Sequence, residues 1–394
     1  MKTTLSEQVL RPSWVEVDLD AIAFNTRQVK NYLKDTELLA VVKADAYGLG
    51  AVPVARTILE NGASRLGVVM LDEAIELRKA GITRPILNMG PILPHQAHYV
   101  LDYDLEQMVF TLDVAEALSE QAAKKGSTAK IHFKIDTGMS RYGEHWSRAA
   151  ETAERMAHLP DVRIVGAMTH FPMSDALDKS FALLQIHRFK EIRRQLEEQN
   201  IHIPTWHICN SGGTLDLPQA HLDMVRVGLM LYGYFPSQDV RQPFPLKPAM
   251  SVKTRIVAVR TIQRGDTVGY GRRFMAEKEE RIAVLPIGYA DGYDRGLRNI
   301  GQVLLHGQPA PIVGGLCMDA CFIKVTEIPE AKVGAEVTIM GQEGDREISP
   351  HDIAGLINSV SYEVMARFGR RLPRVYKKGG KIESIRNYLL NLLK

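Results

Sequence analysis

The sequence lacks the features that mark several large classes of protein. It has only three cysteines among 394 residues, Cys209, Cys317 and Cys321, and their spacing fits neither a zinc site nor a disulfide framework. No apolar stretch approaches the length that spans a bilayer, and the first residues, MKTTLSEQVLRPSW, hold no apolar core of a secretory signal. These absences argue against a disulfide scaffold and an integral membrane protein, and they predict free thiols in a cytoplasmic protein.

Charge of either sign is also not concentrated anywhere in the chain. The formal net charge is +3, charged residues make up 24% of the sequence, and no dense run of Lys or Arg is present. A nucleic-acid partner is therefore not indicated. Hydrophobic residues make up 45%, which is typical of globular domains, and the length is too great for one ordinary core. Such a length suits a large barrel followed by a second domain.

Residues 14–245 alternate short apolar runs with amphipathic segments of helical period. The predicted strands are 38–43, 65–70, 85–89, 105–110, 130–136, 163–170, 205–210 and 224–228. The predicted helices are 52–61, 71–80, 112–124, 145–158 and 177–199, with Asp72 and Asp113 as N-caps. Eight strand–helix repeats favour a (β/α)8 barrel of TIM type. An open doubly wound sheet is the alternative, but it usually carries a Gly-rich dinucleotide turn after its first strand, and this sequence has none.

The sequence changes character near residues 243–248, where three prolines fall within six residues. The strands predicted downstream are 251–262, 281–286, 302–305, 311–313, 322–325 and 336–340. A helix is predicted over 350–357, and apolar residues at helical spacing predict another in the tail, 382–394. We therefore expect an α/β barrel over 14–245 and a mostly β C-terminal domain over 246–387, with residues 1–13 as candidates to pair with the second domain.

The stretch 38–50, LLAVVKADAYGLG, ends a buried strand at Lys43. Ligands bind at the carboxyl ends of the strands in α/β barrels, so this lysine is expected at the functional face. A half-desolvated lysine there has a lowered pKa and can act as an amine nucleophile that forms a Schiff base with an aldehyde. The alternative is a solvated lysine that only marks the end of a strand. The small residues, the phenol of Tyr47 and the glycine turn that follow favour the functional interpretation.

Further polar residues lie at or near predicted strand ends. Lys134 and Arg141 flank a glycine turn in KIDTGMSRYG, and His170 follows an apolar strand in AMTHF. Ser211 precedes two glycines in ICNSGG, where backbone N–H groups suit a phosphate. The structural alternatives are a local ion pair, a core histidine and a plain helix N-cap. Arg226, inside the apolar strand MVRVG, is the hardest to explain structurally, because a buried guanidinium must be paired.

Together these segments resemble the alanine racemases, enzymes of fold type III that use pyridoxal phosphate (PLP). VVKADAYGLG resembles the cofactor-lysine segment of that family, and VGYGRRF, IGYADGYDR, GLCMDA and SYEVMARFGRRLPRVY match further family segments. The resemblance runs from Trp14 to Tyr376. It implies a PLP-dependent isomerase that interconverts L- and D-alanine and supplies D-alanine for cell-wall peptidoglycan.

Racemisation needs a base on each face of a planar intermediate, because one base removes a proton and the other delivers it. The resemblance makes Lys43 one of these catalytic residues and Tyr270, in VGYGRRF, the other. It also implies that Tyr270 reaches in from a second subunit, so that a head-to-tail homodimer with shared active sites is required. An ordinary turn aromatic is the structural alternative for Tyr270 taken alone.

The resemblance assigns the remaining residues to the cofactor and the substrate. The expected PLP-binding residues are Lys43, Tyr47, His170, Ser211, Arg226, Gly228, Leu229 and Tyr362. The substrate carboxylate is expected to meet Arg141 and the backbone N–H of Met318. Lys134 is the candidate for carbamylation, which would turn a repelling cation into an anion that orients Arg141. Arg226 is expected at the pyridine nitrogen, where it keeps its own proton and leaves the ring unprotonated.

The chain departs from the family pattern at three positions. Leu49 and Gly315 stand where a histidine and an arginine are usual, and Ala320 replaces a glutamine. Because these departures lie near the expected substrate entrance, a racemase of broader range, acting on serine or lysine, is the main alternative. A fold-type III decarboxylase would carry a glutamate where Arg226 stands, and a non-catalytic PLP-binding barrel would lack the second domain. No metal and no membrane partner is expected.

Overall fold

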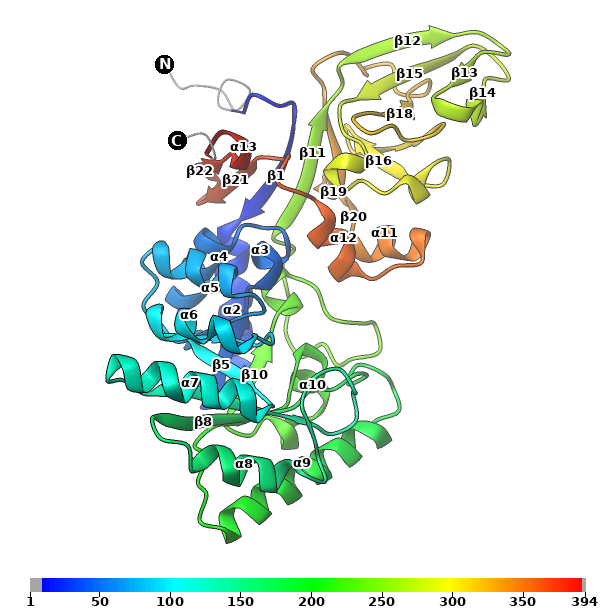
Figure 1. The fold of residues 1–394 in the computed structure, drawn as a ribbon. Helices are drawn as coiled ribbons and strands as arrows, with labels where there is room; N and C mark the ends of the chain where they lie inside the picture. The colour runs from blue at the N-terminus through cyan, green and yellow to red at the C-terminus, as the bar shows by residue number, and fades with distance from the viewer. Residues whose placement is uncertain (1–8, 392–394) are drawn as a thin grey trace. The chain divides into compact units, whose positions relative to one another are not determined.

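The computed structural model describes residues 9–391, which form two compact units (Figure 1). The barrel unit consists of Ala21–Ala46 and Ala51–Lys247. The β unit consists of residues 9–20, 47–50 and 248–391. The four residues that follow Ala46 thus belong to the β unit although they lie between two segments of the barrel unit. All three cysteines of the sequence lie in the described part and are free.

Eight parallel strands build the barrel, as the sequence predicts. They are β2 (Glu37–Val41), β3 (Arg65–Val68), β4 (Ile86–Asn88), β5 (Glu106–Val109), β6 (Ala129–Asp136), β8 (Val162–Met168), β9 (Trp206–His207) and β10 (Met224–Val227). From β2 to β9 each strand pairs with the next, and β10 pairs with β2. The N–H of Arg226 donates to the carbonyl of Cys209 at 3.0 Å, which links β10 to the segment after β9 and nearly closes the ring. The two-residue β7 (Glu144–His145) pairs with β6.

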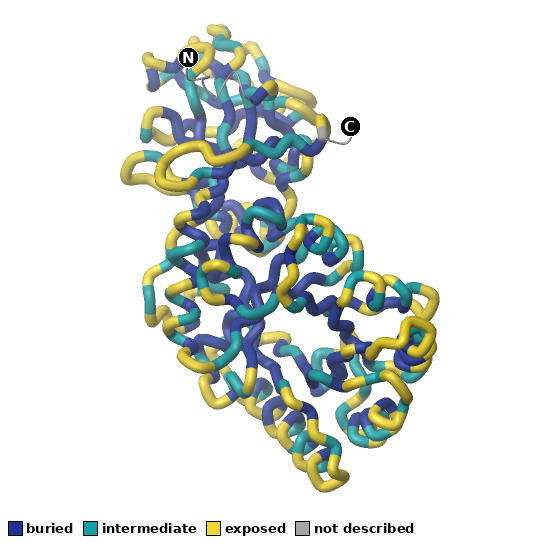
Figure 2. The backbone as a smooth tube through the Cα atoms, turned by 90° about the vertical axis from the view of Figure 1, so that its left-hand side faces the viewer, coloured by how far each residue is buried: buried dark blue, intermediate teal, exposed yellow. Residues whose placement is uncertain are grey.

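The barrel strands form where the sequence has short β-branched or otherwise apolar runs. Such runs suit strands that are covered on both faces, as in parallel sheets. The buried stretches gather in the middle of the barrel unit, and exposed stretches lie on its outer helices and loops (Figure 2). The helices between the strands are α2 (Leu19–Leu33), α4 (Ala51–Glu60), α5 (Leu71–Lys79), α6 (Ala97–Asp102), α7 (Leu112–Lys125), α8 (Ala149–Ala157), α9 (Ser180–Glu198) and α10 (Ser211–Asp216). Across residues 9–391, no helix has both the length and the apolar character to cross a membrane.

The prediction that Asp72 and Asp113 cap helices is wrong. Helix α5 is capped by Met70 and α7 by Thr111, and both acidic residues lie inside the first turn. In α5 the side chain of Glu73 takes over the capping role, because its carboxylate accepts the N–H of Met70 at 3.2 Å. The acidic residues of the first turn still stabilise the helix through its dipole, which favours negative charge at the N-terminus.

The β unit is built around one mixed sheet and one smaller antiparallel sheet. The larger has the order β17 (Gln308–Pro311), β16 (Gln302–Leu305), β19 (Glu336–Glu343), β11 (Met250–Arg255), β1 (Ser13–Asp18), β21 (Arg374–Lys378) and β22 (Lys381–Arg386), with β20 (Arg346–Ile348) on β19. The smaller has β12 (Ala258–Ile262), β15 (Glu280–Leu285) and β18 (Cys321–Lys324) side by side (Figure 1). The N-terminal strand β1 runs antiparallel to β11 and parallel to β21.

Most elements predicted for this unit are present, with three differences, and the strands β1, β20 and β21 were not predicted. The single strand predicted over 251–262 is two strands, β11 and β12, in different sheets. The strand predicted at 311–313 lies earlier, as β17. The helix predicted in the tail is wrong over its first half, because β22 pairs with β21 before a short helix, α13 (Tyr388–Asn391). Residues 392–394 of that prediction lie outside the described residues. The helix predicted over 350–357 is present as α11 (Pro350–Ile357).

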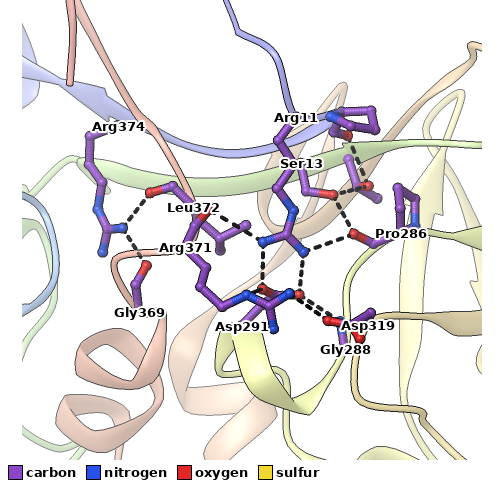
Figure 3. A network of polar contacts seen from close by, with 12 residues as sticks. Arg11, Ser13, Pro286, Gly288, Asp291, Asp319, Gly369, Arg371, Leu372 and Arg374 are labelled. Carbon is purple, nitrogen blue, oxygen red and sulfur yellow. Dashed lines mark hydrogen bonds and ion pairs between the residues drawn. The ribbon is translucent and has the colours of Figure 1, made fainter. Parts of the chain in front are cut away.

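A buried ion pair ties the start of the β unit to one of its later turns (Figure 3). The two terminal nitrogens of Arg11 donate to the two carboxylate oxygens of Asp291, each at 2.6 Å, and Asp291 is fully buried. The same carboxylate accepts the N–H of Gly288 at 3.0 Å. Arg11 also donates to the carbonyls of Pro286 and Arg371. The pair therefore fixes the turn η5 (Tyr289–Asp291).

Replacing Asp291 with asparagine is expected to lower the free energy of unfolding of the β unit by about 3–5 kcal/mol, because Arg11 keeps its charge and loses its carboxylate. Urea unfolding measures the change. The matched control is Glu383→Gln, which removes the exposed partner of Lys378 in the same unit and should cost less than about 1 kcal/mol. Equal effects of the two substitutions would contradict this account of the pair.

Candidate active site

Lys43 lies where the first barrel strand gives way to a turn. Strand β2 is buried almost throughout, and Lys43, two residues beyond its end, is partly buried. Burial lowers the pKa of the Lys43 amine, and the positive charge of Arg141 lowers it further, while the carboxylate of Glu73 opposes the shift. An amine with a lowered pKa is more often unprotonated at neutral pH, which is the form that acts as a nucleophile.

The four residues after Lys43 form a left-handed turn. Ala44–Tyr47 have φ values of 53°, 54°, 53° and 56°, in the region that L-residues rarely occupy. Each such residue costs about 1–2 kcal/mol, so the conformation persists only because its surroundings hold it. One of these restraints is the carboxylate of Glu73, which accepts the N–H of Ala44 at 2.6 Å. Strain of this kind is found mostly at functional sites, and it fixes the backbone directly beside the lysine.

Lys134 and His170 lie on or just after neighbouring strands of the barrel. Lys134 is buried in β6, and His170 follows β8. Burial, then the charges of Arg226 and Arg141, lower the pKa of Lys134 well below its usual value. Burial and the charges of Arg226 and Lys134 likewise lower the pKa of His170 well below its usual value. Burial, together with the neighbouring positive charges, therefore favours the neutral form of both side chains.

Arg226 is buried in β10, and the structure shows how its polar atoms are satisfied. One terminal nitrogen lies 3.0 Å from Nδ1 of His207 and 3.0 Å from the His207 carbonyl. The other lies 2.7 Å and 2.9 Å from the carbonyls of Thr169 and Ile208, and 3.1 Å from Nδ1 of His170. Burial lowers the pKa of Arg226 to about 10, so the guanidinium remains charged at neutral pH. Its partners are neutral atoms, not the carboxylate that a buried arginine usually meets.

Within the described part of the chain, the basic groups at this end of the barrel make no ion pair, although the charges of Glu73 and Asp136 act to raise the pKa of Lys43 and of Lys134 respectively. Among residues 9–391, the ion pairs include none made by Lys43, Lys134, Arg141 or Arg226. The positive charge of Arg141 lowers the pKa of Lys43, of Lys134 and of Arg226, as expected where like charges repel one another. An anionic ligand among them would relieve that repulsion.

The predicted phosphate-binding residues come together on neighbouring elements. Ser211 is buried at the start of α10, and its hydroxyl accepts the N–H of Gly228 at 3.3 Å. Leu229 is buried directly after that glycine, at the start of η3 (Leu229–Tyr232). Asn210 caps α10, because its side chain accepts the N–H of Gly213 at 3.0 Å. The N-cap proposed as the structural alternative is thus real, but it uses Asn210 and leaves Ser211 facing Gly228.

Arg141 differs from the other cations because it is exposed. It lies in the loop after β6, and its guanidinium carbon is 5.7 Å from the centre of the Tyr142 ring. No ion pair ties it to Asp136, whose carboxylate instead accepts the N–H groups of Gly138 and Met139, each at 2.9 Å. The turn KIDTGMSRYG is therefore held by its own aspartate, which leaves the arginine side chain accessible to a ligand.

The remaining predicted residues belong to the β unit. Tyr270 lies in η4 (Tyr270–Arg272) between two glycines with positive φ, and it is 77% exposed. Met318 is 53% exposed, and its carbonyl accepts the N–H of Ala290 at 3.1 Å. The rings of Tyr47 and Tyr362, the latter in α12 (Ser361–Arg367), have centres 6.1 Å apart. Burial raises the pKa of Tyr47, so this phenol keeps its proton.

Three buried polar residues near the site were not predicted. Glu106, His132 and His207 lie inside barrel strands and are almost completely buried. Glu106 accepts two bonds from Arg65, at 2.6 and 2.9 Å, and lies 3.1 Å from Nε2 of His132. The signal in the sequence was at least one ionisable residue within each of three segments predicted as buried strands, which is uncommon unless such a residue is paired.

Glu106 makes the stability of the barrel unit depend on pH. Burial alone would raise its pKa, but the hydrogen bond from His132 and the charge of Arg65 outweigh burial and bring it to about 2. Because the pKa in the folded state is lower than in the unfolded chain, the carboxylate stabilises the fold above about pH 4.5 and this stabilisation is lost as the pH falls towards about 2.

We expect Glu106→Gln to lower the free energy of unfolding by a few kcal/mol at neutral pH, on the order of 3 kcal/mol, and by much less near about pH 3. Urea unfolding of the native chain and the variant at both pH values measures the difference. A penalty that is the same at both pH values would show that the carboxylate's charge is not its cause.

A parallel barrel with a partly buried lysine and several basic groups at the carboxyl ends of its strands is an architecture typical of enzymes that bind small anionic molecules. The family model for the N-terminal domain of alanine racemase matches residues 17–236, and the model for the C-terminal domain matches residues 249–376. The chain belongs to the alanine racemase family. The prediction from the sequence motifs, and with it the racemisation of alanine as the activity, is therefore confirmed.

Relatives and solved structures agree over nearly the whole chain. An alanine racemase of Clostridium tetani is 43% identical over 96% of this chain and 99% of its own length. The structure of alanine racemase from Bacillus anthracis with bound L-Ala-P is 36% identical and covers 97% of this chain and 99% of its own, with a TM-score of 0.92. A histidine racemase from Leuconostoc mesenteroides subsp. sake is 29% identical and covers 93% of this chain and 98% of its own, with a TM-score of 0.86.

Proposed function

We propose that the chain racemises alanine with PLP held at Lys43 and with Tyr270 as the second base. The observation that carries this proposal is the partly buried amine of Lys43 at the end of β2, whose pKa is lowered by burial and by the charge of Arg141. When bound, PLP supplies an aldehyde that takes up the amino group and a ring that delocalises the electron pair left when the Cα proton departs.

The residues present fit such a cofactor. PLP carries a phosphate and a phenolate oxygen, and the cations around Lys134 repel one another in the absence of an anion. Ser211 and the N–H groups of Gly228 and Leu229 would hold the phosphate, with Tyr362 and Tyr47 as further contacts. His170 would lie against the ring, and its neutral form suits a stacking contact.

Arg226 would face the pyridine nitrogen. A guanidinium with a pKa of about 10 does not give up its proton at neutral pH, so it donates a hydrogen bond without protonating the ring. An unprotonated ring would draw less charge from the substrate, so this role of Arg226 would favour the return of a proton to Cα. The residue thus supports racemisation over side reactions that need a protonated ring.

Two residues would move the Cα proton. The Nζ of Lys43 would act on one face and the hydroxyl of Tyr270 on the other. Arg141 and the N–H of Met318 would bind the substrate carboxylate and hold Cα between them. The high exposure of Tyr270 leaves its hydroxyl available to a second copy of the chain, which would make the enzyme a head-to-tail homodimer with shared sites.

Lys134 would carry a carbamate. Burial, and then the charges of Arg226 and Arg141, lower the pKa of its amine and so favour the neutral form, which is the form that reacts with carbon dioxide. The resulting anion would compensate part of the positive charge and orient Arg141. The D-alanine formed would serve cell-wall peptidoglycan in the cytoplasm, where free thiols such as Cys209 persist.

Borohydride reduction tests the cofactor assignment. The protein is loaded with PLP, reduced and digested, and the labelled peptide is identified by mass spectrometry. We expect the label on Lys43 and not on Lys134, the other barrel lysine with a lowered pKa. A label on Lys134, or none on either lysine, would overturn the assignment.

Mixing two inactive variants tests the shared site. Lys43→Ala and Tyr270→Phe are unfolded and refolded together, and activity is compared with each variant alone. If Tyr270 comes from the partner, half of the dimers are mixed and each has one intact site, so about a quarter of the native activity returns. No recovery would show that both residues act within one chain.

A further inference from the structure

A continuous row of buried polar side chains crosses the barrel from Glu106 to Arg226. Nε2 of His132 lies 3.1 Å from the carboxylate of Glu106, and its Nδ1 lies 2.9 Å from Nε2 of His207. Nδ1 of His207 lies 3.0 Å from a terminal nitrogen of Arg226. The four residues come from β5, β6, β9 and β10, and each is at least nine-tenths buried.

The guanidinium at one end determines where the protons lie. Every polar atom of Arg226 is a donor, so Nδ1 of His207 must be an acceptor without a proton. The proton of His207 is therefore on Nε2, from which it is donated to Nδ1 of His132. That nitrogen must also be free of a proton, so the proton of His132 lies on Nε2 and is donated to Glu106. Both histidines are neutral and have the same tautomer.

The carboxylate at the other end requires the same arrangement. An ionised Glu106 can only accept, and Arg65 donates to both of its oxygens, at 2.6 and 2.9 Å. Nε2 of His132 must then be the donor, in agreement with the assignment made from the arginine. The two ends of the row therefore select one direction for all three hydrogen bonds.

We propose that Glu106, His132 and His207 are positioning residues that hold Arg226 in one orientation, as a hydrogen-bond donor towards the cofactor ring. A buried arginine normally contacts a carboxylate directly. Here the imidazole rings of His132 and His207 lie between the carboxylate of Glu106 and Arg226. This arrangement leaves the face of the guanidinium free of a competing anion. The inference rests on the proposed function of Arg226 and adds the residues that make it possible.

Glu106→Gln should reverse the row. Arg65 needs an acceptor, so the amide oxygen of the new side chain turns towards it and the amide N–H2 group faces His132. His132 must then accept a hydrogen bond at Nε2 and donate one from Nδ1 to Nε2 of His207. The proton of His207 therefore moves to Nδ1, where it faces an N–H group of Arg226. Arg226 loses an acceptor and moves. Glu37→Gln is the matched control, because Glu37 also pairs with Arg65, at 2.9 Å, but lies outside the row.

Nitrogen NMR of the full chain labelled at histidine tests the proton assignment without any substitution that affects folding. Before and after loading with PLP, we expect His132 and His207 each to carry the proton on Nε2 and none on Nδ1. A charged ring, or a proton on Nδ1 of either residue, would overturn the proposal. In Glu106→Gln the protons should move to Nδ1, and in Glu37→Gln they should stay.

Steady-state kinetics in both directions test the effect on the reaction. Removing the partner that orients a functional side chain typically costs 10- to 100-fold, so we expect kcat of Glu106→Gln to fall by about that factor, with KM for alanine changed by less than about threefold. Glu37→Gln should retain native kinetics. Unchanged kcat in Glu106→Gln would contradict the proposal. In that case Arg226→Gln shows which proposal is wrong. If Arg226→Gln also retains native kcat, the proposed function of Arg226 is wrong. If Arg226→Gln has a lowered kcat, the function of Arg226 stands and only the positioning role of Glu106, His132 and His207 is wrong.

Discussion

Lys43→Ala is expected to lower kcat for alanine racemisation by at least about 10³-fold in both directions, because one substitution removes the amine nucleophile and one of the two proton carriers. The folded state should be almost unaffected, since the pKa of the lysine is lowered by burial and its charge is not stabilised where it lies. Rates from L- and from D-alanine, measured with PLP in excess, give the change.

The control for Lys43→Ala is Lys130→Ala. Lys130 is also a barrel lysine, but it is exposed and pairs with Asp104 at 2.9 Å on the outside of the unit. Its loss should leave kcat within about twofold of the native value, as expected for an exposed pair. If Lys43→Ala retained more than about a tenth of native activity, neither role assigned to the lysine could stand.

Tyr270→Phe is expected to slow racemisation by about 10²–10⁴-fold while leaving exchange on the face served by Lys43. The substitution removes only the hydroxyl of a side chain that is 77% exposed, so the free energy of unfolding should change by less than about 0.5 kcal/mol. If the variant still exchanged the Cα hydrogen of one enantiomer of alanine with solvent but no longer formed the opposite enantiomer, the missing group would be the second base.

Tyr142→Phe is the control for that variant, because Tyr142 is another exposed tyrosine, 41% accessible, on the barrel unit. It stacks near Arg141 and has no proposed part in proton transfer. Its racemisation rate should stay close to native in both directions. Unimpaired racemisation by Tyr270→Phe would remove the tyrosine from the mechanism.

The fold was largely predictable because its signal is periodic. Runs such as 38–42 are apolar throughout, and a parallel barrel buries such runs on both faces, so their spacing alone predicts eight strands. The tail was not predictable by the same argument. Its apolar spacing at Ile382 and Ile385 fits a helix, but pairing with β21 makes this stretch the strand β22. In a short segment, pairing with a neighbouring strand can outweigh a helical spacing of apolar residues.

The candidate site was predictable only in part. Lys43 and Arg226 stand out physically, as a lysine that ends a buried strand and an arginine within one. Nothing in the local sequence marks Met318 or Tyr362, which were found through the family resemblance alone. The left-handed turn after Lys43 was missed because it contains alanines, which rarely adopt that conformation.

The positioning row was missed for a different reason. Glu106, His132 and His207 lie on three different strands, and nothing in the sequence links one of them to another. Only the order of the strands brings them within hydrogen-bond distance of one another and of Arg226. The sequence can identify each buried polar residue, but the hydrogen-bond partner of that residue becomes known only from the order of the strands in the barrel.

Hydrogen exchange at Cα in D2O tests the two-base account most directly. The protein is incubated with PLP and either enantiomer of alanine, and deuterium at Cα and chirality are followed in the same samples, with L-serine and L-lysine in parallel. The account predicts that deuterium enters as the opposite enantiomer forms, from both directions, with little reaction of serine or lysine. Exchange that proceeds without inversion would contradict it, because Lys43 would then act alone.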